Sequence, residues 1–467
     1  MPSTYYATYL EAAAIAGAEV SWEIVSDGKP WKAATTDYAF SRVLPPGPER
    51  VNPAYRSLLM QQEMRRSKGG SIGIGNKGAI AIRFDDWQND LRTTVAPLLI
   101  ARGLPFSHAL ISKFDTAHSW GVGTTWADIK SLHSQGMEIW SHGEDHDDYI
   151  GNAGLYRNLV QSRLTIESHG IKVQGFSMPG VGSTYSDAVR GNARPYNGLT
   201  AIDDYDSAEG NLIQETYALS EAYAGAAYRD IPNGFYHGSG HSTLNLLTLT
   251  TALASVDFCE NFKTCARFMC HPGTLGSDGP LTLADFTTWL DYVVARRDAG
   301  GIEVVTPSAL PYIDKSTART DLLRAGDLVG VSVATPLSWL DVHSSGTNII
   351  YSSGGISGGP YFEVISTGPS QLLPGLLERG FAGESFIFEG WCKSMGGSTT
   401  DAQVVITDYP TPTDLNITRT FTGVSNSVWK RVLVPFIVPL AADRVKIYIT
   451  RSAGNNTGWA NMSVKKV

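Results

Sequence analysis

The stretch AIAIRFDDWQND, residues 79–90, places two adjacent carboxylates at the end of an apolar run. The apolar run is typical of a buried strand, and parallel α/β folds build their active sites where strands end. Successive side chains of a strand point to opposite faces, so Asp85 and Asp86 can share one side only if the chain turns there. The pair therefore indicates either a turn with solvated charges, for which aspartate is common, or a site that needs two carboxylates for different tasks.

Outward from this stretch, strand-like and helix-like segments alternate over residues 78–312. Residues 124–136, TTWADIKSLHSQG, have the period of a helix with a threonine cap and a glycine stop, and MEIWSHG, residues 137–143, follows as a strand. Strands that alternate with helices predict a parallel sheet with helices outside it. Seven or eight such units favour a closed or nearly closed α/β barrel over an open sheet.

The two ends of the chain differ from this middle part. Residues 1–77 are interpreted as an irregular leader or attachment segment, because breakers and a glycine-rich run interrupt every pattern. Residues 313–330 are interpreted as a linker. Residues 331–467 are rich in Ser, Thr, Gly and Val and contain short strand-like runs between turn signals, which predicts an antiparallel β-sandwich.

The sandwich is expected to be a carbohydrate-binding or assembly module. Trp391, Trp429 and Trp459 can offer stacking faces to a sugar or fill the core, and a core position is favoured for at least one of them.

The composition excludes several classes of protein. A net charge of −8 and a pI near 5.7 argue against a general nucleic-acid binder, and no apolar run is long enough to predict a membrane span. The N-terminus lacks the pattern of a signal peptide. Cys259, Cys265 and Cys270 lack zinc-ribbon spacing, so free, partly buried thiols are favoured, while a Cys259–Cys265 disulfide stays open.

A second polar group lies at the end of the strand predicted within residues 137–143. His142 and His146 in SHGEDH are four residues apart, and two histidines at that spacing can converge on one metal ion if the segment turns. With Asp86 they make an Asp-His-His set with open positions for water and substrate, as hydrolytic zinc sites require. A divalent ion, with zinc the expected metal, would acidify water and polarise a carbonyl. Asp85 would then act as the general base.

A later strand ends in FMCHPG, which places His271 at the same edge, where it can protonate a leaving group or simply cap the strand. The run FSMPG, residues 176–180, supplies Met178 and Pro179 as a groove wall, with an ordinary turn as the alternative.

Taken together, these motifs resemble those of the polysaccharide deacetylases of carbohydrate esterase family 4. RFDDW matches the first motif of the family at Phe84, Asp85 and Asp86, SHGEDH the second at His142 and His146, and MCHPG the last at His271. The resemblance implies a distorted (β/α) barrel of seven or eight units over residues 78–312. It also implies that Asp85 is the base, His271 the acid, and that Asp86, His142 and His146 bind the metal. The implied reaction is hydrolysis of an N-acetyl or O-acetyl group on a glycan.

Two motifs depart from the family pattern. Ser177 stands where the family has an arginine that tunes the base, so Asp85 is expected to lack that charge partner. In AIDDYDS, Asp203, Asp204 and Asp206 all remain candidates to support His271.

Further residues are assigned to the substrate groove. Trp87 follows the aspartate pair, and YHGSGH places His237 and His241 in a glycine-rich loop. With Met178 and Pro179 they form the expected substrate-binding set. The second histidine pair has no accompanying carboxylate motif, so a loop at the groove is favoured over a second metal site.

Three functions stay open at this point: a metal-dependent glycan deacetylase, a non-catalytic receptor-binding tail protein that keeps the barrel to recognise host glycan, and a structural tail component. An irregular leader, a barrel and a terminal sandwich resemble the architecture of bacteriophage tail proteins that meet the host envelope. The expected partners are an acetylated glycan of the bacterial envelope, other tail proteins and, in one arrangement, two further copies in a homotrimer. The expected location is the virion, with a secreted bacterial enzyme as the alternative.

Overall fold

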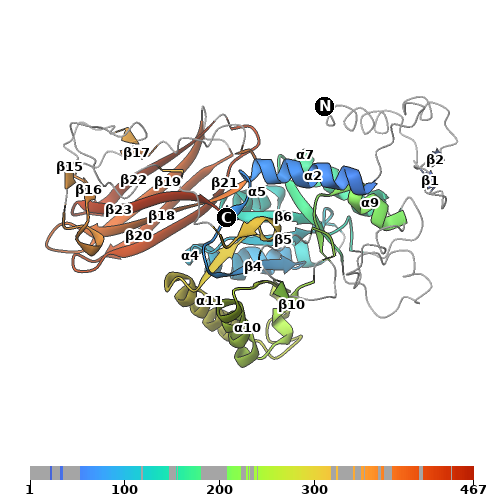
Figure 1. Cartoon of the computed structure of the whole chain (residues 1–467), viewed down its shortest axis with the longest axis horizontal. Coiled ribbons are helices and arrows are strands. Elements are labelled where there is room, and N and C mark those ends of the chain that lie inside the picture. Colours follow the sequence, from blue (N-terminus) through green and yellow to red (C-terminus); the bar gives the residue numbers. More distant parts are fainter. Residues whose placement is uncertain are drawn as a thin grey trace.

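The structure is a computed structural model of the chain of 467 residues. It describes residues 21–23, 32–34, 53–116, 119–146, 154, 156–179, 208–221, 228–229, 231, 236–238, 240–316, 322–323, 340–341, 349–351, 353–365, 370–372, 381–409, 414–442 and 444–467. Figure 1 shows a curled parallel sheet at the centre of the view and two antiparallel sheets to its left.

Strand β4, Gly78–Asp85, lies in the middle of the parallel sheet, and all eight of its residues are buried. This agrees with a strand covered on both faces, which reads as a continuous apolar run. The strand order is β10-β11-β4-β5-β6-β7-β8, while β12 pairs with the first half of β4 and the short β9 pairs antiparallel with β11. The bounds are β5 Phe106–Leu110, β6 Met137–Ser141, β7 Val173–Ser177, β8 Ser220–Glu221, β9 Tyr228–Arg229, β10 Ser242–Thr243, β11 Cys265–Cys270 and β12 Ile302–Val305.

Helices cover the outside of this sheet as the sequence predicts. The bounds of these segments are α3 Gln88–Asp90, η2 Leu91–Val95, α4 Ala96–Ala101, α5 Trp126–Ser134, η4 Arg157–Gln161, α7 Ser162–Ser168, α9 Ala208–Thr216, α10 Leu249–Phe262 and α11 Leu283–Asp298. The threonine cap expected for the helix within residues 124–136 is confirmed, because Thr125 and Asp128 form a capping box at the start of α5. The described strands make a curled sheet whose two ends, β10 and β8, do not pair with each other, so the ring is not closed within the described residues.

Part of the range interpreted as a leader is ordered against the barrel. Helix α2, Pro53–Ser67, places Met64 in a small apolar cluster with Trp140 of β6 and Tyr312. Strand β3, Ile72–Gly73, pairs with β13, Ile313–Asp314. The sequence pattern did not predict this packing because α2 has little apolar periodicity and instead fits a mixed polar and apolar surface.

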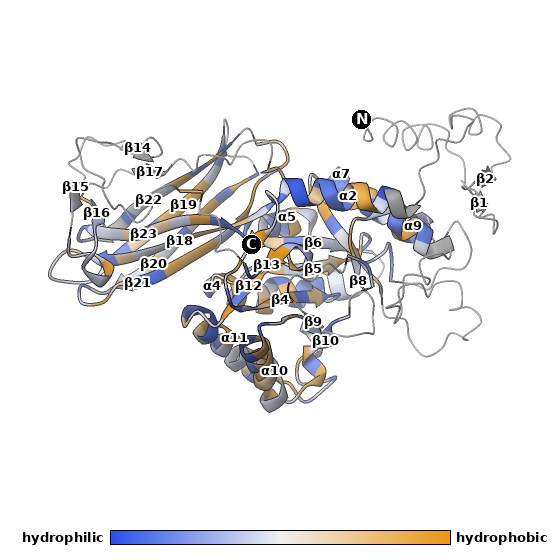
Figure 2. Cartoon of the chain, in the orientation of Figure 1, coloured by the Kyte–Doolittle hydropathy of each residue, from blue (hydrophilic) through white to orange (hydrophobic). Residues whose placement is uncertain are grey.

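The C-terminal strands form two five-stranded antiparallel sheets, as predicted for a β-sandwich. One has the order β14-β17-β22-β19-β20, and the other β15-β16-β23-β18-β21. Their strands carry both hydrophobic and hydrophilic residues (Figure 2), and the inner apolar residues share one core. The bounds are β14 Leu340–Asp341, β15 Ile349–Tyr351, β16 Tyr361–Val364, β17 Ser370–Leu372, β18 Ser385–Ser394, β19 Thr400–Tyr409, β20 Asn416–Val424, β21 Lys430–Ile437, β22 Arg444–Gly454 and β23 Thr457–Lys466.

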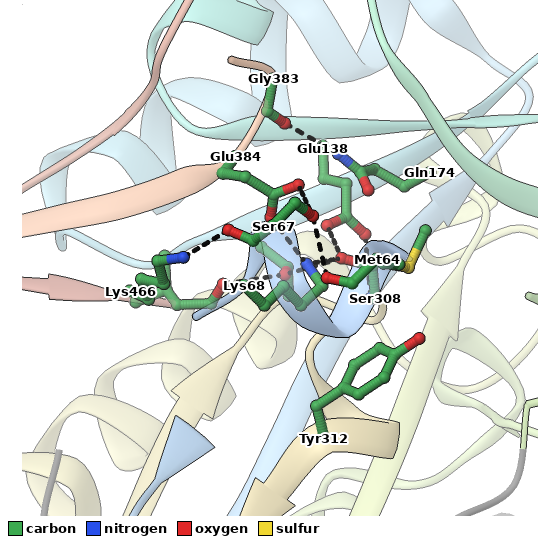
Figure 3. A network of polar contacts seen from close by, with 12 residues as sticks. Met64, Ser67, Lys68, Glu138, Gln174, Ser308, Tyr312, Gly383, Glu384 and Lys466 are labelled. Carbon is green, nitrogen blue, oxygen red and sulfur yellow. Dashed lines mark hydrogen bonds and ion pairs between the residues drawn. The ribbon is translucent and has the colours of Figure 1, made fainter. Parts of the chain in front are cut away.

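A buried polar network joins α2, the barrel and the sandwich (Figure 3). Glu384, just before β18, pairs with Lys68 at 3.2 Å and with Lys172 at 2.6 Å and accepts a hydrogen bond from Ser67. Lys68 also donates to Ser308, whose hydroxyl donates to Glu138 of β6. A fully bonded network of buried charges fixes how the elements pack, because each charge is costly to bury without its partners.

The four cysteines, Cys259, Cys265, Cys270 and Cys392, are free and buried, so the free-thiol interpretation is confirmed. Among the described residues, no helix is long and apolar enough to cross a membrane.

Candidate active site

Three side chains meet at the carboxyl edge of the parallel sheet. Asp86 directly follows β4, His142 directly follows β6, and His146 lies four residues further along the same loop. One ligand atom from each lies within 4.8 Å of those of the other two. The Asp86 carboxylate is 3.6 Å from Nε2 of His142 and 3.3 Å from Nε2 of His146. The structure therefore brings together the three side chains that the sequence assigned to a metal ion.

The chain turns sharply at this edge, which allows Asp85 and Asp86 to serve one site. Asp86, Trp87 and His146 have φ values of 56°, 48° and 63°, and they are half of the positive-φ residues other than glycine in the described chain. A left-handed conformation costs a side-chain-bearing residue on the order of 1 kcal/mol. Such strain gathers at functional sites because the surrounding structure holds it in place.

The imidazole of His142 is oriented by the neighbouring strand. Its Nδ1 lies 2.9 Å from the backbone carbonyl oxygen of Ser177 at the end of β7. A carbonyl only accepts, so Nδ1 carries the proton, and in the neutral ring the lone pair of Nε2 is available to a cation. This tautomer is the one that a metal-binding histidine requires. Ser177 thus contributes its backbone to the site.

The donor set fits a divalent cation. Within the described residues, Oδ1 of Asp86 is buried with no hydrogen-bond partner, as expected for an oxygen that binds a cation. Burial alone would raise the pKa of Asp86, but His142 and His146 lower it below its ordinary value, so the group is an anion at neutral pH. One carboxylate and two imidazoles are a donor set typical of zinc and related transition metals.

Asp85 has a charge partner that the sequence did not reveal. Nε and Nη2 of Arg83 each donate to one carboxylate oxygen of Asp85, both at 2.7 Å. Burial would raise the pKa of Asp85, but Arg83, followed by the nearby imidazoles, lowers it well below its ordinary value. The prediction that Asp85 lacks a charge partner is therefore wrong. Residue 177 is a serine, but Asp85 is paired with Arg83 from its own strand.

A second buried layer lies beneath Asp85. Glu221 of β8 forms ion pairs with Arg83 and, at 2.6 Å, with Arg267 of β11. The Arg267 guanidinium lies 5.6 Å from the ring centre of Trp140. Sequence reasoning missed these residues because no local motif marks them. The sequence did hold one signal for them. Arg83 and Arg267 are charged side chains within otherwise apolar strand-like runs, where a buried charge needs a partner.

His271 is located as the sequence predicts, beside β4. It directly follows β11, whose Cys270 pairs with Phe84, so His271 lies level with Asp85 at the carboxyl edge of the sheet. Its backbone N–H donates to the Asn245 side chain at 3.4 Å. His241 is buried and interacts electrostatically with Asp85 and His271, and burial lowers its pKa to about 3. Asp203, Asp204 and Asp206, the candidates to support His271, lie outside the described residues.

Two tryptophans form an aromatic wall beside the loop that carries His146. The ring centres of Trp87 and Trp120 are 5.5 Å apart, and Trp120 meets His146 edge to face at 5.4 Å. Gly273 makes room for Trp87, since a Cβ there would lie 2.0 Å from the indole. Trp120 was missed in the sequence because it stands in a loop without a pattern.

The other residues of the predicted substrate set take different places. Met178 and Pro179 follow β7 and are buried, with Met178 in the main apolar core. His237 is half-buried between Ser57 of α2, 2.6 Å from Nε2, and Ser220 of β8, 2.9 Å from Nδ1. Their contact with substrate stays a prediction.

Residues 73–197 match the family model described as polysaccharide deacetylase. This range contains Asp85, Asp86, His142, His146 and Ser177 and excludes His271. The comparison with curated proteins gave no match.

Three solved structures are similar to parts of the chain. A structure described as T48 deacetylase with substrate is 16% identical, with 50% of this chain and 90% of that chain covered and a TM-score of 0.29. The xylan-binding domain of Paenibacillus barcinonensis Xyn10C is 11% identical, with coverages of 32% and 97% and a TM-score of 0.24. A two-module structure of Clostridium thermocellum xylanase 10B is 14% identical, with a TM-score of 0.23, and the match spans 28% of this chain and only 26% of that one.

Proposed function

We propose that this protein is a metal-dependent hydrolase that removes acetyl groups from a glycan. The observation that carries the proposal is that two adjacent aspartates have different partners. Asp86 lies 3.6 and 3.3 Å from two imidazoles, whereas Asp85 is paired with Arg83 and left out of that cluster. The match of residues 73–197 to the polysaccharide deacetylase model supports a deacetylase.

Asp86, His142 and His146 would hold the cation, which when bound supplies a Lewis acid for the acetyl carbonyl and for water. Asp85 accepts the proton of the attacking water, since its lowered pKa keeps it ionised at neutral pH. As the new carbon–oxygen bond forms, the bond between the acetyl carbon and the glycan nitrogen or oxygen breaks. His271, half-buried at the same edge, donates a proton to that leaving atom, and acetate is released.

The aromatic wall of Trp87 and Trp120 is proposed to hold a sugar ring next to the acetyl-binding position. Indole faces stack on the apolar face of a sugar, and Trp120 is half-buried beside His146. His241, neutral at pH 7 because burial lowers its pKa, is proposed to exchange hydrogen bonds with sugar hydroxyls.

The sandwich is proposed to bind glycan on the outer face of its β15-β16-β23-β18-β21 sheet, at the end of that face that carries Tyr361 and Trp429. The other end of the same face is covered, because Leu433 and Pro435 of β21 pack against Gly103 and Gly136 of the barrel. Tyr351 stacks on Tyr361 with ring centres 4.7 Å apart, and Tyr361 meets Trp429 at 5.9 Å. Trp391 points outward from β18, because its neighbour Cys392 lies in the core. Such a module would hold the enzyme on a polymer while the barrel acts on it.

The setting remains the one expected from the sequence. The proposed substrate is an acetylated glycan of the bacterial envelope, and the proposed location is a bacteriophage tail or, alternatively, the outside of a bacterial cell. Non-catalytic recognition of host glycan is the competing function.

Acetate release decides between these functions. Purified protein is incubated with acetylated bacterial envelope glycan and with a small aryl acetate, with and without a chelator, and its metal content is measured. We expect acetate release that chelation abolishes and added zinc restores. A protein that retains no divalent ion and releases no acetate is not the enzyme, and binding of that inactive protein to host envelope would favour the recognition function.

A further inference from the structure

Arg83 is held against Asp85 in a geometry that leaves little freedom to either side chain. The two residues are two positions apart on β4, so their side chains lie on the same face of the sheet. The bond is bidentate, with Nε and Nη2 each 2.7 Å from a different carboxylate oxygen. Both side chains are almost inaccessible, at 1% and 5% exposure. A bidentate guanidinium fixes the plane of a carboxylate as well as its charge.

The guanidinium is itself fixed from behind. Glu221 contacts Nη1 of Arg83 and pairs with Arg267 at 2.6 Å. In the strand register Glu221 lies beside Ser177, the position where the resemblance expects the arginine of the family. The carboxylate of Glu221 thus lies beside the position where the family arginine is expected. It pairs instead with Arg83, which comes from β4.

This arrangement determines which lone pairs of Asp85 remain available. A carboxylate has about four acceptor sites, and Arg83 occupies one on each oxygen from below. The remaining sites are directed away from Arg83, toward the edge of the sheet where His142 and His271 interact electrostatically with Asp85. The position of the proton acceptor is therefore set by Arg83.

We propose that Arg83 is the positioning residue of the Asp85 base, and that it replaces, from a different strand position, the arginine expected at residue 177. This inference rests on the proposed function, because it assigns to Asp85 the task of accepting a proton from water. Arg83 itself touches neither substrate nor cation.

The test compares two arginines of the same buried layer. Arg83→Gln removes the hydrogen bonds to Asp85, whereas Arg267→Gln removes a cation of equal charge that pairs with Glu221 and acts on Asp85 only through longer-range electrostatics. With a small aryl acetate and saturating zinc, Arg83→Gln is expected to lower kcat by about 100-fold at nearly unchanged KM, since a misplaced catalytic group costs that much. Zinc content should stay at the parental level, and Arg267→Gln should lose much less rate.

Two further measurements separate positioning from folding. Arg83→Lys keeps the charge but loses the bidentate fork, so it should fold with the parental melting temperature and still lose about tenfold in kcat. In Arg83→Ala, added guanidinium should restore part of kcat, and the same guanidinium should not help Arg267→Ala.

The outcomes distinguish the two proposals. If the parent releases acetate and the Arg83 variants fall no further in kcat than the Arg267 variants, the positioning role is wrong and the proposed function stands. If the Arg83 variants lose zinc along with rate, Arg83 supports the fold of the site and not the base, which also overturns the inference. A zinc-loaded parent that releases no acetate from any acetylated substrate overturns both.

Discussion

Asp86 and His142 face each other with Oδ1 and Nε2 3.6 Å apart, beyond the reach of a hydrogen bond although both are buried. Two buried polar atoms at that distance are unfavourable unless something lies between them. A tetrahedral ion with bonds of about 2.1 Å holds neighbouring ligand atoms about 3.4 Å apart. The spacing of this pair thus matches two ligands of one cation better than an ion pair, and the 3.3 Å between Asp86 and His146 fits two such ligands as well as a hydrogen bond.

Asp86→Ala should abolish tight binding of a divalent ion. Zinc at 100 times its dissociation constant should stabilise the parent by about 2.7 kcal/mol, and the variant by much less. Thermal unfolding with and without zinc measures this difference. Asp85→Asn is the matched control, since it removes a neighbouring carboxylate but should keep the zinc-induced shift. Equal shifts in the parent and in Asp86→Ala would exclude Asp86 as a ligand.

Ion binding should weaken in acid because protons compete for His146. Burial alone would lower its pKa, but the hydrogen bond and charge of Asp86 raise it above the ordinary 6.5 in the ion-free protein. Below that raised pKa the apparent zinc affinity should fall by about tenfold per pH unit. Competition titrations with a zinc chelator between pH 5 and 8 measure this loss of affinity. The pH values are spaced by about half a unit around the ordinary pKa of histidine.

The ion-free protein should show the opposite dependence in its stability. A raised pKa in the folded state means that His146 contributes stability fully below the ordinary pKa of 6.5, and that this contribution is lost as the pH rises through the folded-state value. The difference in unfolding free energy between the parent and His146→Gln should therefore shrink from pH 6 to pH 8. A difference that grows over this range would contradict the assigned interaction with Asp86.

The metal cluster was predictable from the sequence, whereas the environment of the base was not. Asp86, His142 and His146 each directly follow a strand or lie in the loop after it, and parallel strands bring their carboxyl ends to one edge. Local motifs therefore specified which side chains converge. The sequence also showed that Ser177 replaces the arginine of the family, but it did not show which residue pairs with Asp85 in its place.

Arg83 shows why that consequence needed the structure. In the sequence it is one cation within an apolar run, and nothing local tells whether it pairs with Asp85. The pairing depends on Glu221, which lies 138 positions away along the chain and is brought beside Arg83 by the curl of the sheet. The packing of helix α2 could not be predicted from local patterns either. Its Met64 packs with residues that are distant along the chain, such as Tyr312.

Glu384→Gln should destabilise the junction of barrel and sandwich. Its carboxylate is buried, and although burial raises its pKa, Lys68 and Lys172 lower that pKa to about 2. Removing one partner of a buried ion pair costs about 3 kcal/mol or more, because Lys68 stays buried without its anion. Urea unfolding at pH 7 measures the loss.

A surface pair provides the control for that experiment. Glu303→Gln breaks the half-exposed pair with Lys77, which should cost less than about 1 kcal/mol. The pH dependence of the Glu384 contribution also has a definite direction. Because the pKa of Glu384 is lowered by folding, its contribution to stability is present above the ordinary pKa of 4.5 and is lost as the pH falls through about 2. The parent and Glu384→Gln should therefore converge in stability in strong acid.

The tryptophans of the sandwich should separate into structural and binding residues. Trp459 is completely buried in the core between the two sheets, so Trp459→Ala should cost about 3–5 kcal/mol. Trp429 lies on the outer face beside Tyr361, and Trp429→Ala should change stability much less. If the outer face binds glycan, Trp429→Ala should weaken retention on insoluble envelope glycan by about fivefold, since a stacked aromatic ring contributes on the order of 1 kcal/mol. Its rate on a small aryl acetate should stay parental, because that substrate needs only the barrel. Retention that is unchanged in both Trp429→Ala and Trp391→Ala would place glycan binding on the barrel alone.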